Sequence, residues 1–167
     1  MKTLFLKLAA ASCLLATGSC FAAGALSVER EVTVDNSPET VWKLIGNFNA
    51  LDVWHPAIVK SELKGNGTKV GAQRLLTLDN GATILEKLLS YSATKKSYSY
   101  SIVKSPLPVA NYTGTVTLTP TAEGHTLLKW SSTFDAAGGA SDEQATTVIG
   151  GVYDAGLAKV VANFKQQ

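Results

Sequence analysis

Trp54-His55-Pro56 is the local pattern in this sequence that could most directly support chemistry. An imidazole exchanges protons near neutral pH, so His55 could hydrogen-bond a ligand carbonyl or act as a general acid or base. Proton transfer normally needs a second positioned group, which the tripeptide does not supply. The alternative is structural: His55 caps the end of a helix while Trp54 fills the core.

Glu86 and Lys87 are adjacent charges in an otherwise apolar predicted strand. Side chains alternate between the two faces of a strand, so the sequence does not decide which of the two points inward. An inward Glu86 would have a raised pKa and could pair with Arg74 or polarise a ligand hydroxyl. An inward Lys87 would suit an anionic ligand. In a third alternative, the carboxylate of Glu86 and the ammonium group of Lys87 both reach water, because charged residues are rarely buried unless paired.

Aromatic side chains recur on two predicted strands. Tyr98 and Tyr100 share one face of the first strand, and Trp130 lies among apolar neighbours on one face of the second. Each combines a large apolar body with one hydrogen-bonding tip, which suits a pocket that orients a mostly apolar ligand. Ordinary core packing or a solvent-facing tyrosine ladder are the alternatives for the tyrosines. We expect Trp130 on the inner face, against the C-terminal helix.

The segment Pro106-Leu107-Pro108 is stiff, because each proline fixes one backbone angle. By themselves, Pro106 and Pro108 predict a rigid turn that loses little freedom on folding.

Most catalytic signatures are missing from the sequence. Two histidines, and two cysteines that both lie before residue 26, make no zinc-ligand cluster. There is no Gly-x-Ser-x-Gly elbow, and the spacing of Gly65, Gly67 and Gly71 does not fit a dinucleotide site. We therefore expect neither a metal nor a cofactor.

Residues 1–25 have the pattern of a secretory signal peptide: a positive start, an apolar run and small residues. Plausible cleavage points follow Ala22 and Ala25, which predicts a periplasmic or secreted protein. Lipidation at Cys20 is the weaker alternative, since the aliphatic residue expected three positions earlier is missing. Residues 26–167 are one ordinary domain, without a stable membrane span in the mature chain.

The net positive charge belongs to the signal segment. Of 15 Lys and Arg, Lys2 and Lys7 precede residue 26, whereas none of the 13 acidic residues does, so the mature chain carries 13 of each. Without a basic excess, nucleic acid is not an expected partner.

Hydrophobic periodicity predicts an α+β domain. One strand comes first, then two short helices, one from Pro38 to Gly46 and one over Phe48–Trp54, and a run of strands separated by turn signals follows. The seven predicted strands are Leu26–Val34, Ile58–Leu63, Ala72–Leu78, Thr83–Leu89, Ser97–Val103, Tyr112–Thr119 and His125–Phe134.

Ser141 to Phe164 predicts a long C-terminal helix that begins with a capping box, Ser141 and Gln144. Gly156 falls on its buried face, either for close packing against the sheet or to leave space beside Tyr153. The side chains predicted to form this face are Ala145, Val148, Ile149, Val152, Tyr153, Leu157, Val160, Val161 and Phe164.

Four features accompany this order of elements: Trp-His-Pro after paired short helices, Pro-Leu-Pro-Val-Ala-Asn-Tyr opening a late strand, Lys-Trp-Ser-Ser-Thr-Phe closing the sheet, and a terminal helix with several glycines. In this combination the chain resembles the START-related helix-grip superfamily (SRPBCC). Within it the chain is similar to the polyketide cyclase/dehydrase-like branch, which includes exported bacterial members. The resemblance implies a curved seven-stranded antiparallel sheet wrapped around the C-terminal helix, with a cavity between them. Because loops at this end gate the cavity in the family, it also implies that Pro106 and Pro108 could form a lid that keeps its shape, as the alternative to a simple rigid turn. It says little about chemistry, because one fold hosts many functions.

We therefore predict an exported domain that binds a small hydrophobic or amphipathic ligand in that cavity. One alternative is a cyclase- or dehydratase-like enzyme in which His55 and Glu86 exchange protons with the substrate. The other is an accessory protein that docks on a periplasmic partner enzyme. The candidate lining residues are Trp54, His55, Arg74, Glu86, Tyr100, Tyr112, Trp130 and Tyr153.

Overall fold

The computed structural model describes residues 24–165, so nearly all of the predicted signal segment lies outside the described residues. The elements follow in the predicted order. They are β1 (Leu26–Val34), α1 (Pro38–Ile45), α2 (Leu51–Trp54), β2 (Ile58–Lys64), β3 (Gln73–Leu78), β4 (Thr83–Ser92), β5 (Ser97–Lys104), β6 (Val109–Pro120), β7 (Thr126–Ala136) and α3 (Asp142–Lys165).

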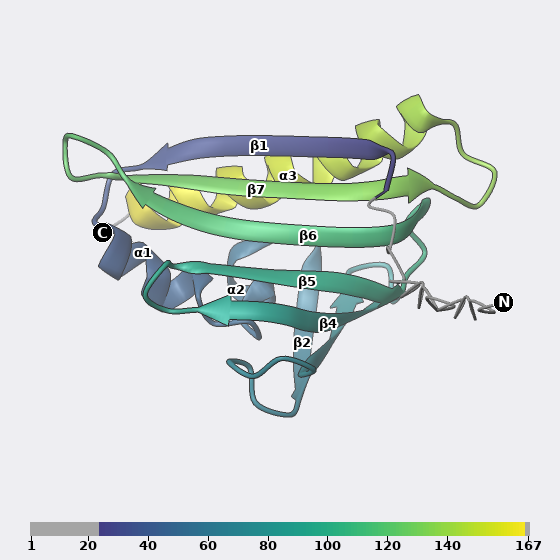
Figure 1. The fold of residues 1–167 in the computed structure, drawn as a ribbon, viewed down its shortest axis with the longest axis horizontal. Coiled ribbons are helices and arrows are strands. Elements are labelled where there is room, and N and C mark those ends of the chain that lie inside the picture. Colours follow the sequence, from purple (N-terminus) through teal and green to yellow (C-terminus); the bar gives the residue numbers. More distant parts are fainter. Residues whose placement is uncertain (1–23, 166–167) are drawn as a thin grey trace, which may run out of the picture.

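The seven strands form one antiparallel sheet in the order β1-β7-β6-β5-β4-β3-β2. Figure 1 shows β2 running steeply across the direction of β5, β6 and β7, so the sheet is strongly twisted, and α3 lies behind β1 and β7. Two register shifts between β4 and β5, one next to Glu86 and one after Leu88, contribute to the curvature, because a bulge bends its strand. The predicted helix-grip fold is confirmed.

The capping box at the start of α3 forms as predicted. Gln144 Oε1 accepts from the Ser141 backbone N–H (2.8 Å), and Ser141 Oγ accepts from the Gln144 N–H (3.2 Å). Two backbone donors that the helix leaves unpaired are thereby satisfied.

The buried face of α3 is narrower than the sequence predicted. Ile149, Tyr153 and Leu157 are buried, whereas Val148 is 39% exposed. The prediction for Val148 was wrong because the concave sheet contacts only the side of the helix centred near Tyr153, and Val148 lies at the margin of that side.

The short helix α2 begins at Leu51, three residues later than predicted. The Asn47 side chain accepts a hydrogen bond from the Asn49 N–H (3.0 Å), and this local turn competes with a helix over residues 48–50. Because Phe48 is then free of the helix, its ring enters the core and its carbonyl faces the sheet interior.

Candidate functional site

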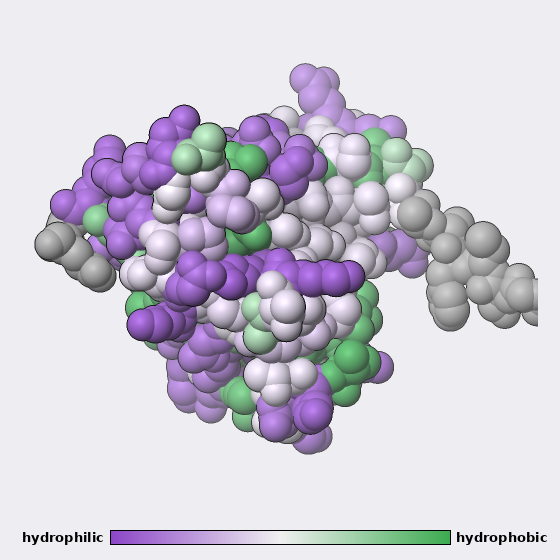
Figure 2. All heavy atoms as spheres, turned by 60° about the vertical axis from the view of Figure 1, so that its left-hand side comes forward, coloured by the Kyte–Doolittle hydropathy of each residue, from purple (hydrophilic) through white to green (hydrophobic). Residues whose placement is uncertain are grey.

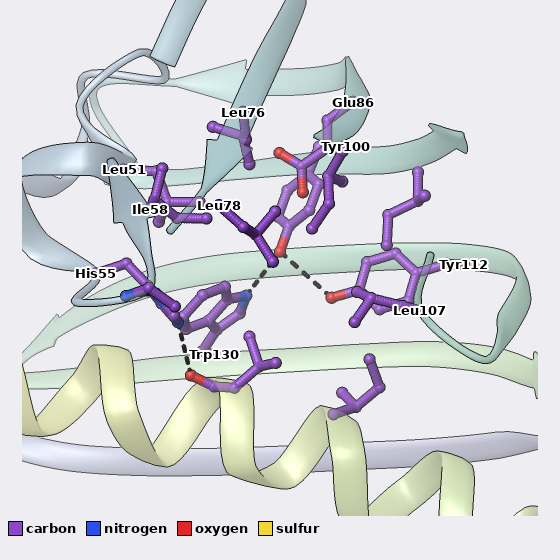
Figure 3. A pocket seen from close by; sticks show the side chains of 15 residues that line it. Leu51, His55, Ile58, Leu76, Leu78, Glu86, Tyr100, Leu107, Tyr112 and Trp130 are labelled. Carbon is purple, nitrogen blue, oxygen red and sulfur yellow. Dashed lines mark hydrogen bonds between the residues drawn. The ribbon is translucent and has the colours of Figure 1, made fainter. Parts of the chain in front are cut away.

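A cavity lies between the concave face of the sheet, the α2–β2 segment and α3 (Figure 3). Its volume is about 70 Å³, room for roughly five water molecules at ~10–15 Å³ each. Its walls are almost wholly apolar and include Leu76, Leu78, Ile102, Leu107, Ile149 and Val152. The side chains that bring polar atoms to it are His55, Glu86, Tyr100, Tyr112 and Trp130.

His55 is the C-cap of α2, and its ring stands edge-on to Trp130, with 6.2 Å between the ring centroids. Its Nδ1 accepts from the Ala57 N–H (3.2 Å), so the ring proton lies on Nε2, which donates to the Val152 carbonyl (3.0 Å). Burial lowers the pKa of His55 below its ordinary value, although the Val152 carbonyl opposes the shift. His55 therefore joins α2 to α3 as a neutral ring, and both of its nitrogens are engaged.

Glu86 points inward and Lys87 outward, which decides the alternative that the sequence left open. Arg74, its cross-strand neighbour on β3, donates from Nε to Glu86 Oε2 at 2.5 Å, and both side chains are buried. Burial raises the pKa of Glu86, and the contact with Arg74 opposes that rise. Burial alone would lower the pKa of Arg74, but Glu86 and nearby tyrosines raise it above its usual value. The result is a buried ion pair at one end of the cavity.

The Phe48 segment completes the environment of Arg74. Arg74 Nη1 donates to the Phe48 carbonyl, and the guanidinium lies over the Phe48 ring, 4.3 Å from its centroid. The third guanidinium nitrogen, Nη2, and the Tyr98 hydroxyl are buried without a hydrogen-bond partner among the described residues. Burial raises the pKa of Tyr98 to about 12, so this hydroxyl stays protonated.

Three tyrosine hydroxyls form a chain beside the cavity. Trp130 Nε1 donates to the Tyr100 hydroxyl (2.9 Å), which lies 3.3 Å from that of Tyr112, and Tyr112 lies 2.5 Å from that of Tyr153. The rings of Trp130 and Tyr153 stack with 4.3 Å between centroids. Burial raises the pKa of all three tyrosines, so they remain neutral hydrogen-bonding groups.

Two glycines make room for these aromatic rings. A Cβ at Gly114, the cross-strand neighbour of Tyr100, would lie 2.6 Å from Tyr100 Cζ. A Cβ at Gly156 would lie 2.8 Å from His55 Cδ2 and 2.9 Å from a ring carbon of Trp130. Of the two explanations for Gly156, the structure therefore supports close packing, although against side chains rather than the sheet backbone.

Of the eight predicted lining residues, five border the cavity and three do not. Trp54 packs edge-on against Trp130, Arg74 lies behind Glu86, and Tyr153 contacts Tyr112 and Trp130, which line the cavity. These three support the site from behind its walls.

Pro106 and Pro108 do not line the cavity, but Leu107 between them does. The sequence analysis singled out the prolines because their backbone angles are fixed. It missed Leu107 and the other apolar walls, since an apolar residue that borders a cavity has the same sequence pattern as one in solid core.

A separate hollow, open to solvent, lies over α1 and is lined by Trp42, Phe48, Leu63 and Tyr91 among others. The rings of Trp42 and Tyr91 are 5.7 Å apart between centroids. On the face shown in Figure 2, apolar side chains of the described residues are scattered among polar ones and form no single broad patch.

Within residues 24–165, no group of His, Cys, Asp or Glu is arranged to hold a metal ion. In the same range, no helix combines the length and the apolar composition needed to cross a bilayer.

The sheet, the helix and the cavity between them together define a helix-grip protein. Residues 25–165 match the model of the family described as polyketide cyclase/dehydrase and lipid transport. The chain belongs to this family, as its resemblance to the SRPBCC polyketide cyclase/dehydrase-like branch implied.

Solved structures from bacteria share the fold. The protein XoxI from Bacillus cereus is 35% identical, with a TM-score of 0.78 over 83% of this chain and 95% of XoxI. A protein from Nitrosospira multiformis is 32% identical, with a TM-score of 0.73 over 83% of this chain and 96% of its own. One from Thermobifida fusca is 25% identical, with a TM-score of 0.74 over 84% of this chain and 93% of its own. No curated protein matches the chain.

Proposed function

We propose that this protein binds a small hydrophobic or amphipathic molecule in the cavity between sheet and α3. The observation that carries the proposal is an apolar cavity inside the core with a few polar groups converging on one side, Glu86, Tyr100 and Tyr112. Ligand sites in proteins typically have this composition, with apolar walls for affinity and a few polar groups for orientation. The family description, which includes lipid transport, agrees with this class of function.

The cavity as it stands is small. Its 70 Å³ is about half of the ~150 Å³ of an engineered apolar cavity that binds benzene. A ligand of that size or larger would therefore move part of the wall. Leu107 is the wall residue carried by the Pro106–Pro108 loop, and we propose that this loop, whose shape the two prolines hold, moves as a unit and acts as a gate.

We also propose that the protein works after export, in the periplasm or outside the cell. The Ala25 N–H donates to Asp135 (2.9 Å), and Gly24 lies so close to Phe134 that a Cβ there would be 2.2 Å from its carbonyl carbon. Cleavage after Ala22 would keep these contacts, whereas cleavage after Ala25 would remove them. The mass of the mature protein tests the proposal: we expect a chain that begins at Ala23, and a full-length chain in the cytoplasm would contradict export.

The acid–base alternative has less support. His55 and Glu86 do border one cavity, as that alternative requires. However, both His55 nitrogens are engaged by Ala57 and Val152, and one carboxylate oxygen of Glu86 is held by Arg74. Binding needs no rearrangement of these groups, whereas proton transfer from His55 does.

A pair of substitutions on α3 tests the binding proposal. Val152 borders the cavity, and Val148, one turn earlier, is exposed and does not. Native mass spectrometry of protein purified from its own host should show a bound small molecule on the wild type and on Val148→Phe, and none on Val152→Phe. Equal occupancy of the two variants would place the ligand elsewhere and overturn the proposal.

A further inference from the structure

Glu86 presents an unused hydrogen-bond acceptor to the cavity. Its Oε2 accepts from Arg74 Nε, and no donor among the described residues reaches its Oε1. The side chain is 5% exposed and borders the cavity, where Figure 3 shows its carboxylate directed inward beside Tyr100. An ionised carboxylate can accept about four hydrogen bonds, so Oε1 can accept one from a group placed in the cavity.

Tyr100 can supply a donor next to this acceptor. Its hydroxyl oxygen already accepts from Trp130 Nε1 and lies within reach of Tyr112, which in turn contacts Tyr153. When Tyr153 donates to Tyr112 and Tyr112 to Tyr100, the proton of Tyr100 is left for a partner in the cavity. Three linked hydroxyls permit this direction because each can donate or accept.

The charge balance selects the ligand class. Arg74 neutralises Glu86, so a cationic ligand would bring an uncompensated charge into a largely apolar space. An anionic ligand would meet the carboxylate at short range and be repelled. A neutral group that donates to Glu86 and accepts from Tyr100 satisfies both without adding charge, and a hydroxyl is the smallest such group.

We propose that the cavity is selective for a neutral alcohol or phenol, whose O–H donates to Glu86 Oε1 and whose oxygen accepts from Tyr100. The apolar body of the ligand then lies against Leu76, Ile102 and Leu107. This assignment rests on the proposed binding function and names the chemical class that the cavity recognises.

A probe series with the wild-type protein tests the assignment. Phenol, benzene, benzylamine and benzoate share one ring and differ in the group that would meet Glu86. Affinities from NMR titration should rank phenol at least tenfold above benzene and benzylamine, with no measurable binding of benzoate. Benzene binding as tightly as phenol would overturn the hydroxyl assignment and leave cavity binding intact. Failure of every probe to bind would overturn both proposals.

A matched pair of tyrosine variants provides an independent readout. In Tyr100→Phe the ratio of phenol to benzene affinity should fall about tenfold, because the donor to the ligand oxygen is gone. Tyr98→Phe is the control: it lies on the same face of β5, is equally buried, does not border the cavity, and its hydroxyl has no partner among the described residues. An unchanged ratio in Tyr100→Phe, or an equal fall in Tyr98→Phe, would contradict the proposal.

Discussion

The buried pair of Arg74 and Glu86 should behave as one energetic unit. We consider the single variants Arg74→Met and Glu86→Leu and the double variant that carries both changes. Glu86→Leu leaves a fully buried guanidinium without its counter-charge, which costs about 3–5 kcal/mol of unfolding free energy. Arg74→Met leaves a buried carboxylate instead, with a cost of about 3–5 kcal/mol at neutral pH.

The double variant should lose far less unfolding free energy than the sum of the losses in the two single variants. It removes both charges and leaves mainly the Phe48 carbonyl without its donor, at a cost of about 1–3 kcal/mol. The sum of the single effects is about 6–10 kcal/mol, so the coupling between Arg74 and Glu86 should be at least about 3 kcal/mol.

Urea unfolding followed by tryptophan fluorescence measures these differences directly. Burial already raises the pKa of Glu86, and without Arg74 nothing opposes that rise. The penalty of Arg74→Met should therefore grow as pH rises above about 4.3, the ordinary pKa of glutamate, and shrink below it. A double variant that loses the full sum of the single effects, or a pH-independent Arg74→Met penalty, would refute the reasoning.

Three further predictions concern the packing around the site. Gly156→Ala should lower the free energy of unfolding by about 1–3 kcal/mol because its Cβ meets His55 at 2.8 Å, whereas Gly151→Ala, on the same helix with open space, should raise it by up to about 1 kcal/mol; chemical denaturation distinguishes the two. Gly114→Ala should displace the Tyr100 ring, which near-ultraviolet circular dichroism would detect, and unchanged spectra would contradict the packing described. Because the pKa of His55 is lowered in the native state, the unfolded chain binds the extra proton, and stability should fall as pH drops below about 6.5. His55→Asn should show a shallower fall over this range.

The order and type of the elements could be predicted from the sequence because local signals act over a few residues. Ser141 and Gln144 specify the start of α3 by reciprocal hydrogen bonds, and these form as expected. The period-two pattern specifies that a strand exists and which side chains share a face. It does not specify which face is inner, so the orientation of Glu86 followed only from the burial of that face of β4 in the structure.

The cavity itself could not be predicted from sequence patterns. It depends on side-chain volumes and on segments that are distant in the sequence: Gly156 lies against His55, and Leu107 and Val152 line the same cavity. The five polar or aromatic residues that border it were predicted because their polar atoms are unusual in apolar surroundings. Arg74, by contrast, was predicted to line the cavity, but in the structure it lies behind Glu86 and does not border the cavity.

The central claim is that the internal cavity, and not the solvent-exposed hollow over α1, is the ligand site. The most direct measurement is an NMR titration of the wild-type protein with phenol, following methyl and indole signals. We predict the largest shifts at Leu76, Ile102, Leu107 and the indole N–H of Trp130. Largest shifts at Trp42, with the cavity signals unmoved, would contradict the claim.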